Sequence, residues 1–433
     1  MNNVIGLRCI NCGKELTAKP GLYTCPACGP KDGILDVVYD YAKIKRSVPQ
    51  ERVVYSKDYS LFRYLPFLPV EPSTPRPQLR VGLSPLYRTV NLGEQLGLNH
   101  LYVKDDGQNP TASLKDRASV IAVMKAVEEK MTTIACSSTG NAASSLAGNA
   151  AAMGLKTFIF VPGRAPQGKV AQLLIFGANV ISVQGSYSDA FQLSAEAIER
   201  WGWYNRNAAI NPYLMEGKKT VSLEIAEQLA WDAPDWVVVS VGDGCIISGV
   251  WKGFQDLYRV GWIDKLPKLL GVQAAGCSPL ADAILEDRAW RPAEENTIAD
   301  SIAVGVPRNA EKALRAVRES KGTMVTVSDE EILSAMRLLG RTSGIFGEPA
   351  GVTGLAGLKT LVERGVIGSD ERVVVIVTGN GLKDVKNAIT AAGEPIKVEP
   401  SMDQLVAELK KAATAVINII LAQCFIKCSI CDT

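Results

Sequence analysis

The chain has 433 residues, of which 47% are hydrophobic and 21% are charged, and its formal net charge at pH 7 is +2. This near-neutral balance gives no reason to expect a nucleic acid or an anionic membrane surface as a partner. His100 is the only histidine, which excludes mechanisms that depend on a histidine dyad or triad and metal sites built from several histidines.

The N-terminus lacks the charged segment and apolar run of a secretory signal. No apolar stretch reaches the ~20 residues of a membrane-spanning helix. We therefore expect a cytoplasmic protein with no membrane partner. The ten cysteines gather towards the two ends of the sequence, a distribution that argues against a fold built on disulfides.

Two CxxC pairs open the chain, Cys9 with Cys12 and Cys25 with Cys28. A glycine follows each pair and lets the backbone turn so that its amides face the sulfur atoms. Four thiolates satisfy the tetrahedral preference of zinc and leave no open position for a substrate. The pattern predicts a structural zinc ribbon over residues 1–35. The alternative is a set of redox-active or incidental cysteine pairs.

Residues 36–81 are predicted to form an extended connector, because closely spaced prolines disfavour a helix: Pro66, Pro69, Pro72, Pro75 and Pro77. Residues 401–433 are expected to form one C-terminal helix and a tail. The tail contains Cys424, Cys428 and Cys431, whose role the sequence leaves open.

Between residues 82 and 400, short β-branched or aliphatic runs alternate with segments rich in Ala, Leu, Glu and Lys. This alternation predicts an α/β fold with a mainly parallel sheet. The expected strands are Leu101–Lys104, Thr132–Ala135, Thr157–Val161, Asn179–Val183, Trp236–Val241, Leu269–Ala274 and Val373–Val377.

The segment KDDGQNPTASLKDR, residues 104–117, follows the first of these strands. Asn109 and Pro110 predict a turn, and Ser113 is expected to cap the next helix. Lys115 then falls in the first helical turn, where the helix dipole and any nearby cation disfavour its charged form. A neutral lysine amine is the nucleophile of Schiff-base chemistry. A solvated surface lysine is the alternative.

A second polar segment lies between a predicted strand and an alanine-rich helix. There, backbone amides and the hydroxyls of Ser137, Ser138 and Thr139 would bind an anion such as an amino acid carboxylate. The side chain of Asn141 would reach a hydroxyl group of a cofactor. Simple helix capping is the alternative.

Two more segments also follow strands. The loop of Gly242, Asp243, Gly244, Cys245 and Ile246 contains glycines that let the backbone approach a phosphate. It is neither a Walker loop nor the three-glycine dinucleotide pattern. Further along, Thr378 would offer a neutral hydroxyl to a ring nitrogen. A neutral partner leaves a pyridine ring unprotonated, and the ring is then a weaker electron sink.

Taken together and in this order, these segments resemble the threonine synthase family of fold-type II pyridoxal-phosphate (PLP) enzymes. The likeness extends over residues 82–384, and an N-terminal zinc ribbon also occurs in some members. Seven motifs carry it in register: GLSPLYR at 82–88, NPTASLKDR at 109–117, SSTGNAAS at 137–144, EGKKT at 216–220, VGDGC at 241–245, GEPAG at 347–351 and TGNGLKD at 378–384.

The resemblance implies two α/β domains around a cleft that holds PLP, and a homodimer. The smaller domain is expected at about 117–232, and the larger one at 82–116 plus 233–400. The resemblance places the Schiff-base lysine at Lys115 and the contact with the PLP hydroxyl at Asn141. In threonine synthases, water replaces the phosphate of O-phospho-L-homoserine, and the product is L-threonine.

Some positions depart from the family pattern. Cys245 and Ile246 replace a glycine and an asparagine of the cofactor loop, and four positions expected to hold the substrate phosphate are apolar: Ala142, Ala208, Ala209 and Leu214. A phosphate dianion needs charge-assisted hydrogen bonds, each of about 1.5–3 kcal/mol. Either other cations replace the lost contacts, with Arg206, Lys218 and Arg164 as candidates, or the substrate lacks that phosphate.

Three hypotheses therefore follow from the sequence. The chain is a threonine synthase, or it is a related PLP-dependent lyase, dehydratase or β-replacement enzyme with another leaving group. The third hypothesis is a non-catalytic paralogue whose ribbon is an interaction module, and the intact Lys115 argues against it.

Overall fold

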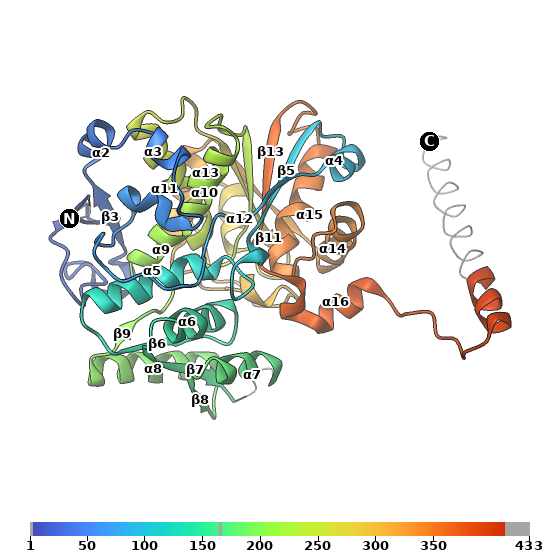
Figure 1. The fold of residues 1–433 in the computed structure, drawn as a ribbon, viewed down its shortest axis with the longest axis horizontal. Coiled ribbons are helices and arrows are strands. Elements are labelled where there is room, and N and C mark those ends of the chain that lie inside the picture. The colour runs from blue at the N-terminus through green and yellow to red at the C-terminus, as the bar shows by residue number, and fades with distance from the viewer. Residues whose placement is uncertain (1–2, 164–166, 412–433) are drawn as a thin grey trace. The chain divides into compact units, whose positions relative to one another are not determined.

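The computed structural model describes residues 3–163 and 167–411. The chain divides into two units, Met1–Ala391 and Ala392–Thr433. All sheets and the sites considered below lie in the first unit, whose ribbon is shown in Figure 1. Arg164 and the three tail cysteines lie outside the described residues.

A six-stranded sheet forms the centre of the first unit, with the strand order β12-β11-β10-β13-β5-β4. All neighbouring strands are parallel except β4, which runs antiparallel to β5. The central strands are continuous apolar runs, as expected for parallel strands with both faces covered by helices. The bounds are β4 (Leu86–Arg88), β5 (His100–Asp105), β10 (Trp236–Ser240), β11 (Lys268–Ala274), β12 (Thr323–Val327) and β13 (Arg372–Val377).

Helices that pack around this sheet alternate with its strands along the chain. Their apolar faces enclose two cores, one on each side of the sheet. These helices are α4 (Val90–Leu96), α9 (Tyr213–Lys218), α10 (Thr220–Gln228), α11 (Cys245–Val260), α12 (Pro279–Leu285), α13 (Ala310–Glu319), α14 (Asp329–Ser343), α15 (Pro349–Glu363) and α16 (Val385–Ala392). Three 3-10 helices accompany them: η2 (Asp106–Gln108), η3 (Asp300–Ile302) and η4 (Gly381–Asp384).

A second, four-stranded sheet is parallel throughout, with the order β8-β7-β6-β9. In Figure 1 it lies below the larger sheet, with α5 and α6 between them. It has a core of its own. Its elements are β6 (Thr133–Ser137), β7 (Lys156–Pro162), β8 (Asn179–Val183), β9 (Tyr204–Asn205), α5 (Lys115–Glu128), α6 (Asn141–Ala151), α7 (Gln167–Ile175) and α8 (Tyr187–Trp201).

The N-terminal segment forms a small antiparallel sheet of the order β2-β1-β3. Its elements are β1 (Val4–Cys9), β2 (Glu15–Leu16), α1 (Gly29–Asp32) and β3 (Leu35–Tyr39). Residues after β3, expected to be an extended connector, instead form α2 (Tyr41–Ser47), α3 (Glu51–Val54) and η1 (Leu61–Phe67). Only Pro66 of the five prolines falls inside a helix, and the apolar residues of η1 are buried against the larger core.

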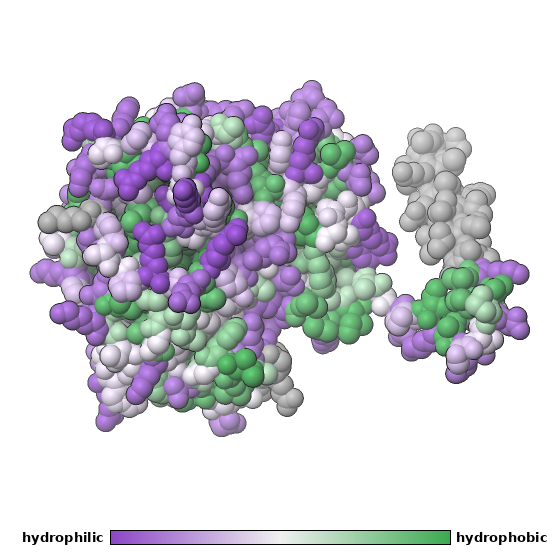
Figure 2. Space-filling model, in the orientation of Figure 1, coloured by the Kyte–Doolittle hydropathy of each residue, from purple (hydrophilic) through white to green (hydrophobic). Residues whose placement is uncertain are grey.

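The α/β class and the mainly parallel sheets are confirmed, and all seven predicted strands are present within two residues of their expected ends. The division into a smaller domain at about 117–232 and a larger one at 82–116 plus 233–400 stays a prediction. Hydrophilic side chains cover much of the face of the first unit seen in Figure 2. Among the described residues, no helix has both the length and the apolar character needed to cross a membrane.

A buried ion cluster joins the start of α5 to the larger sheet. The guanidinium of Arg117 donates to both carboxylate oxygens of Asp106, at 2.7 and 2.8 Å, and to both of Glu224, at 2.5 and 2.7 Å. Lys104 lies 2.7 Å from the same Glu224. Burial raises the pKa of Glu224, but Arg117 and Lys104 outweigh it and lower that pKa to about 2. The carboxyl of Glu224 is therefore ionised at neutral pH.

We expect Arg117→Met to destabilise the fold by about 3–5 kcal/mol, because it leaves Asp106 and Glu224 as buried charges with one cation fewer. Denaturant unfolding followed by circular dichroism measures this change. Arg8→Met is the control, since Arg8 and Glu15 form an exposed ion pair whose loss costs about 1 kcal/mol or less. Equal effects of the two substitutions would contradict the structural importance of the cluster.

Candidate functional site

Lys115 is the first residue of α5, as the sequence predicts. Its amine has no hydrogen bond or ion pair with any described residue, although the side chain is only partly exposed. Burial, with the nearby charges of Lys218 and Arg206, lowers the pKa of Lys115 to about 8, despite opposing effects of Cys245 and Glu348. The amine is therefore much closer to its neutral, nucleophilic form than an ordinary lysine.

The start of α5 is held against the end of β13 rather than capped by Ser113. The backbone amide of Leu114 donates to the carbonyl of Thr378 at 2.9 Å, and Ser113 forms a β-bridge with Gly379. The predicted cap is thus wrong, because this pairing fixes the backbone in place of a side chain. The hydroxyl of Ser113 is buried and has no partner among the described residues. The backbone of Thr378 is thereby joined to the residue before Lys115, and the contact of its hydroxyl with a ring nitrogen stays a prediction.

Asn141 begins α6 and donates from Nδ2 to Oε1 of Glu348 at 2.6 Å. A Cβ on Gly379 would lie 2.2 Å from that Glu348 oxygen and 3.3 Å from Asn141 Nδ2, so only glycine leaves room for the pair. Burial and the charge of Asp300 raise the pKa of Glu348 to about 7, although the bond from Asn141 lowers it. This carboxyl therefore exchanges protons near neutral pH.

The loop at 242–246 leads from β10 into the first turn of α11. Gly244 has a φ of +85°, and a Cβ on Gly242 would lie 2.7 Å from the Cα of Ile302. The side chain of Asp243 accepts bonds from the amides of Arg308 and Asn309, at 2.9 and 3.4 Å, which fixes the loop. Cys245 and Ile246 belong to the first turn of α11, where backbone amides and the helix dipole favour an anion.

The predicted anion site at the end of β6 is only partly free. The amide of Ser137 donates to Oδ1 of Asn207 at 2.8 Å, and the hydroxyl of Ser138 accepts from the amide of Gly140 at 3.2 Å. Thr139 is half-buried, with no side-chain hydrogen bond to a described residue. Nδ2 of Asn207 is buried without a partner in the described chain. Sequence reasoning missed this unsatisfied donor, which lies beside the predicted anion site.

Four apolar residues stand where the family pattern has polar ones, and the structure shows where two of them lie. Leu214 is buried and packs in the core of the smaller sheet. Ala209 has a φ of +56° and lines a small cavity together with Leu214, Lys218 and Cys245. The side chain of Ala208 is exposed, and that of Ala142 is half-buried. None of the four can offer a side-chain hydrogen bond.

Cations have nevertheless gathered around Lys115. Lys218 is 4% exposed, and its ammonium has no hydrogen bond or ion pair with a described residue. A buried ammonium without a partner is costly unless an anion joins it. Arg206 is 2% exposed and donates from Nε and Nη2 to the hydroxyl of Ser119, at 3.1 and 3.0 Å. The arrangement is suited to binding an anion next to the Lys115 amine.

The residues therefore fit PLP, the cofactor that the resemblance implies. A lysine amine with a lowered pKa for the aldehyde, a glycine-containing loop at a helix start for the phosphate, and unpaired polar groups at Ser113 and Asn207 all lie in this region. The residues predicted from the sequence to bind PLP, namely Lys115, Asn141, Thr378 and the loop at 242–246, lie at the ends of α5, α6, β13 and β10. Their contacts with the cofactor stay a prediction. Sequence reasoning missed Glu348, although it lies in the GEPAG motif.

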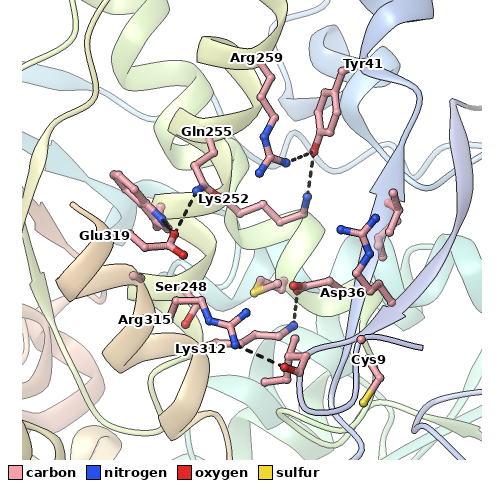
Figure 3. Close-up of a pocket in the computed structure, with 18 residues that line it drawn as sticks. Cys9, Asp36, Tyr41, Ser248, Lys252, Gln255, Arg259, Lys312, Arg315 and Glu319 are labelled. Carbon is pink, nitrogen blue, oxygen red and sulfur yellow. Dashed lines mark hydrogen bonds and ion pairs between the residues drawn. The ribbon is translucent and has the colours of Figure 1, made fainter. Parts of the chain in front are cut away.

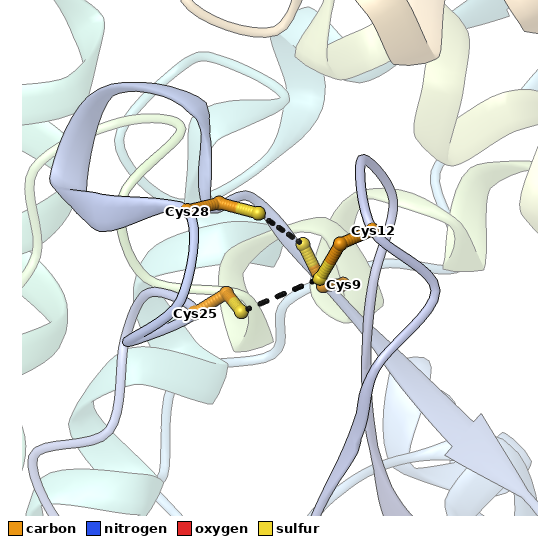
Figure 4. A group of neighbouring side chains, drawn as sticks. All are labelled: Cys9, Cys12, Cys25 and Cys28. Carbon is orange, nitrogen blue, oxygen red and sulfur yellow. Dashed lines mark hydrogen bonds between the residues drawn. The ribbon is translucent and has the colours of Figure 1, made fainter.

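The four N-terminal cysteines form a separate cluster, shown in Figure 4. All four sulfur atoms lie within 4.8 Å of one another, and the Cys9–Cys28 and Cys12–Cys25 sulfur pairs are each 3.8 Å apart. A tetrahedron with metal–sulfur bonds of about 2.3 Å has edges of about 3.8 Å. The donor set and its spacing therefore fit one zinc ion.

Comparison with known proteins places residues 78–379 in a family described as pyridoxal-phosphate dependent enzyme. The threonine synthase of Methanocaldococcus jannaschii is 43% identical over 93% of this chain and 99% of its own length. The threonine synthase of Methanosarcina acetivorans is also 43% identical, over 92% of this chain and 97% of its own.

Solved structures with the same fold are more distant in sequence. A diaminopropionate ammonia lyase from Escherichia coli superposes with a TM-score of 0.62 at 21% identity, over 79% of this chain and 91% of that one. A threonine deaminase from Solanum lycopersicum has a TM-score of 0.61 at 23% identity, over 71% and 87% of the two chains. These likenesses show that the chain shares the fold of these structures.

Proposed function

Because the chain belongs to the family of pyridoxal-phosphate-dependent enzymes and, within it, to the threonine synthases, we propose that it converts O-phospho-L-homoserine and water into L-threonine and inorganic phosphate. The observation that carries this proposal is the unpaired Lys115 amine, with its pKa lowered to about 8, beside the unpaired cation of Lys218. The Lys115 amine is suited to binding the cofactor and transferring a proton. The Lys218 ammonium is suited to binding an anionic leaving group.

The polar groups predicted from the sequence each have a role in this proposal. PLP, when bound, supplies the electron sink for the charge that develops on the substrate carbons. Lys115 holds the cofactor and, once released by the substrate amine, removes the α-proton at Nζ. Asn141 and Thr378 orient the cofactor ring, and the amides at 242–246 hold its phosphate. The turn at Ser137–Thr139 binds the substrate carboxylate.

We assign the substrate phosphate to Lys218, assisted by Arg206. Lys218 stands where the family motif EGQKT has glutamine, and it borders the cavity left by Ala209 and Leu214. In this assignment, the buried ammonium of Lys218 takes the place of neutral side-chain donors that are absent here. A charge-assisted bond to phosphate is about twice as strong as a neutral one, so it offsets part of their loss. This replacement supports the phosphorylated substrate.

A second candidate is a lyase or β-replacement enzyme of the same fold that acts on an amino acid without a phosphate. The four apolar positions at 142, 208, 209 and 214 favour it, since each would leave a phosphate oxygen without a side-chain donor. The unpaired Lys218 weighs against it, because a neutral leaving group would leave that cation unsatisfied. A non-catalytic paralogue would not need a lysine amine with a lowered pKa.

We further propose that the four cysteines hold a structural zinc ion and that the enzyme is a cytoplasmic homodimer. The tetrahedral spacing of the sulfur atoms supports the zinc site. The homodimer and the cytoplasmic location rest on the resemblance to biosynthetic threonine synthases. Exposed apolar side chains on α7 and α16 agree with a subunit interface: Leu174, Ile175, Val385 and Ile389.

The central experiment measures phosphate and threonine produced from O-phospho-L-homoserine by the PLP-loaded protein. We expect equal amounts of the two products from the unaltered enzyme and none from Lys115→Ala. Lys218→Gln should raise KM for this substrate roughly 10- to 100-fold, the equivalent of one charge-assisted bond. Lys218→Arg, which keeps the charge, is the matched control. Bound PLP without phosphate release would reject the proposal in favour of another leaving group.

The zinc proposal is tested by metal analysis of the purified protein. We expect one zinc ion per chain and a loss of that ion in Cys25→Ser, because three thiolates and a hydroxyl bind zinc far more weakly. Cys277→Ser, at a buried cysteine outside the cluster, should keep the metal. A metal content near zero in the unaltered protein, purified without chelators, would contradict the proposal.

A further inference from the structure

A second cavity lies between the N-terminal ribbon and the helices α11 and α13. Its volume is about 320 Å³, and Figure 3 shows its lining. The ribbon contributes β1 and β3 to one wall, and the two helices form the opposite wall. Five cations face it: Arg8, Lys252, Arg259, Lys312 and Arg315. Only two carboxylates, Asp36 and Glu319, line it as well.

The two carboxylates are already engaged. Asp36 lies 2.5 Å from the ammonium of Lys312, which also donates to the carbonyl of Leu35 at 2.8 Å. Glu319 accepts bonds from Nε1 of Trp251 at 2.8 Å and from Nε2 of Gln255 at 3.2 Å. Carboxylates outside the lining pair with two more of the cations, because Arg8 lies 2.6 Å from Glu15 and Lys252 lies 3.4 Å from Asp256. The excess of positive charge in the lining therefore rests on Arg259 and Arg315.

Two guanidinium groups supply this excess. Nη1 of Arg259 donates to the hydroxyl of Tyr41 at 3.3 Å, and Nη2 of Arg315 donates to the carbonyl of Ile10 at 3.3 Å. Neither has a carboxylate partner within the described part of the chain. A guanidinium has five donors in a planar fork, so each retains donors for an incoming oxyanion. Lys252, between them in Figure 3, donates to the same Tyr41 hydroxyl at 3.4 Å and shares the carboxylate of Asp256 with Lys219.

We propose that this cavity binds a small anion that carries a phosphate group, held by Arg259, Lys252 and Arg315. Forked arginine donors match the oxygens of a phosphate, and the volume admits either free phosphate or a small phosphate monoester. The site is separate from the Lys115 site, because neither Lys115 nor Lys218 lines it. It therefore goes beyond the proposed threonine synthase reaction.

The bound anion would act on the cofactor loop through two helices. α11 begins at Cys245 in that loop and carries Lys252 and Arg259. α13 follows Asn309, whose Nδ2 donates to Ser248 Oγ at 2.8 Å, while that hydroxyl donates to the carbonyl of Gly244 at 2.8 Å. An anion that bridges the two helices would fix the distance between them, and the loop lies at their common end. The cavity is thus placed to regulate the site.

Calorimetric titration of the PLP-loaded protein with inorganic phosphate at low ionic strength tests the proposal. We expect the double variant Arg259→Gln/Arg315→Gln to lose one phosphate-binding event, or to bind at least tenfold more weakly there. Arg318→Gln removes an exposed arginine of α13 that does not line the cavity, and it should leave binding unchanged. Circular dichroism confirms that each variant is folded. A titration with glycerol phosphate then compares a monoester with the free ion.

The outcomes separate this site from the proposed active site. Lys218→Gln should retain the binding event that the double variant loses, whether or not the enzyme makes threonine. Tighter binding of the monoester would identify an organic phosphate as the ligand, and tighter binding of the free ion would identify inorganic phosphate. Unchanged phosphate binding in the double variant, or an equal loss in Arg318→Gln, would overturn the proposal.

Discussion

The position of Lys115 depends on the buried ion cluster two residues further along α5. Arg117 joins η2 through Asp106 and α10 through Glu224, and all three side chains are fully buried. Each N–H donor of the Arg117 guanidinium meets a carboxylate or a hydroxyl. The helix α5 therefore cannot rotate without breaking several charge-assisted bonds in an apolar interior. The first turn of α5, and the lysine amine with it, is therefore fixed before any ligand binds.

A second buried network connects the ribbon to the same site. The hydroxyl of Tyr39 in β3 donates to Glu216 at 2.8 Å, and Lys219 bridges Glu216 and Asp256, at 2.5 and 2.6 Å. Glu216 and Lys219 flank Lys218 in the chain, and Asp256 belongs to α11. The ribbon thus contacts the helix that carries Lys218 and the helix that begins in the loop at 242–246.

Much of this arrangement is predictable from sequence, because parallel strands and the polar turns after them are local patterns. The seven strands follow from short apolar runs, the helix start at Lys115 from the turn before it, and the cysteine cluster from the CxxC spacing. Contacts between residues that are far apart in the sequence cannot be predicted in this way. The pairing of Asn141 with Glu348 joins residues 207 positions apart, and the cap expected from Ser113 gave way to a bridge with Gly379, far away in the chain. The helices after β3 form because burial against the larger core outweighs the prolines around them.

The fold itself lowers the pKa of the Lys115 amine to about 8, before any ligand binds. The most direct measurement is the rate at which PLP attaches covalently to the cofactor-free protein, followed by absorbance as a function of pH. Raising the pH through about 8 deprotonates the amine, so the rate should rise with an apparent pKa near 8 and then level off. A rate that still rises towards the ordinary lysine value of 10.5, or attachment that persists in Lys115→Ala, would contradict the account.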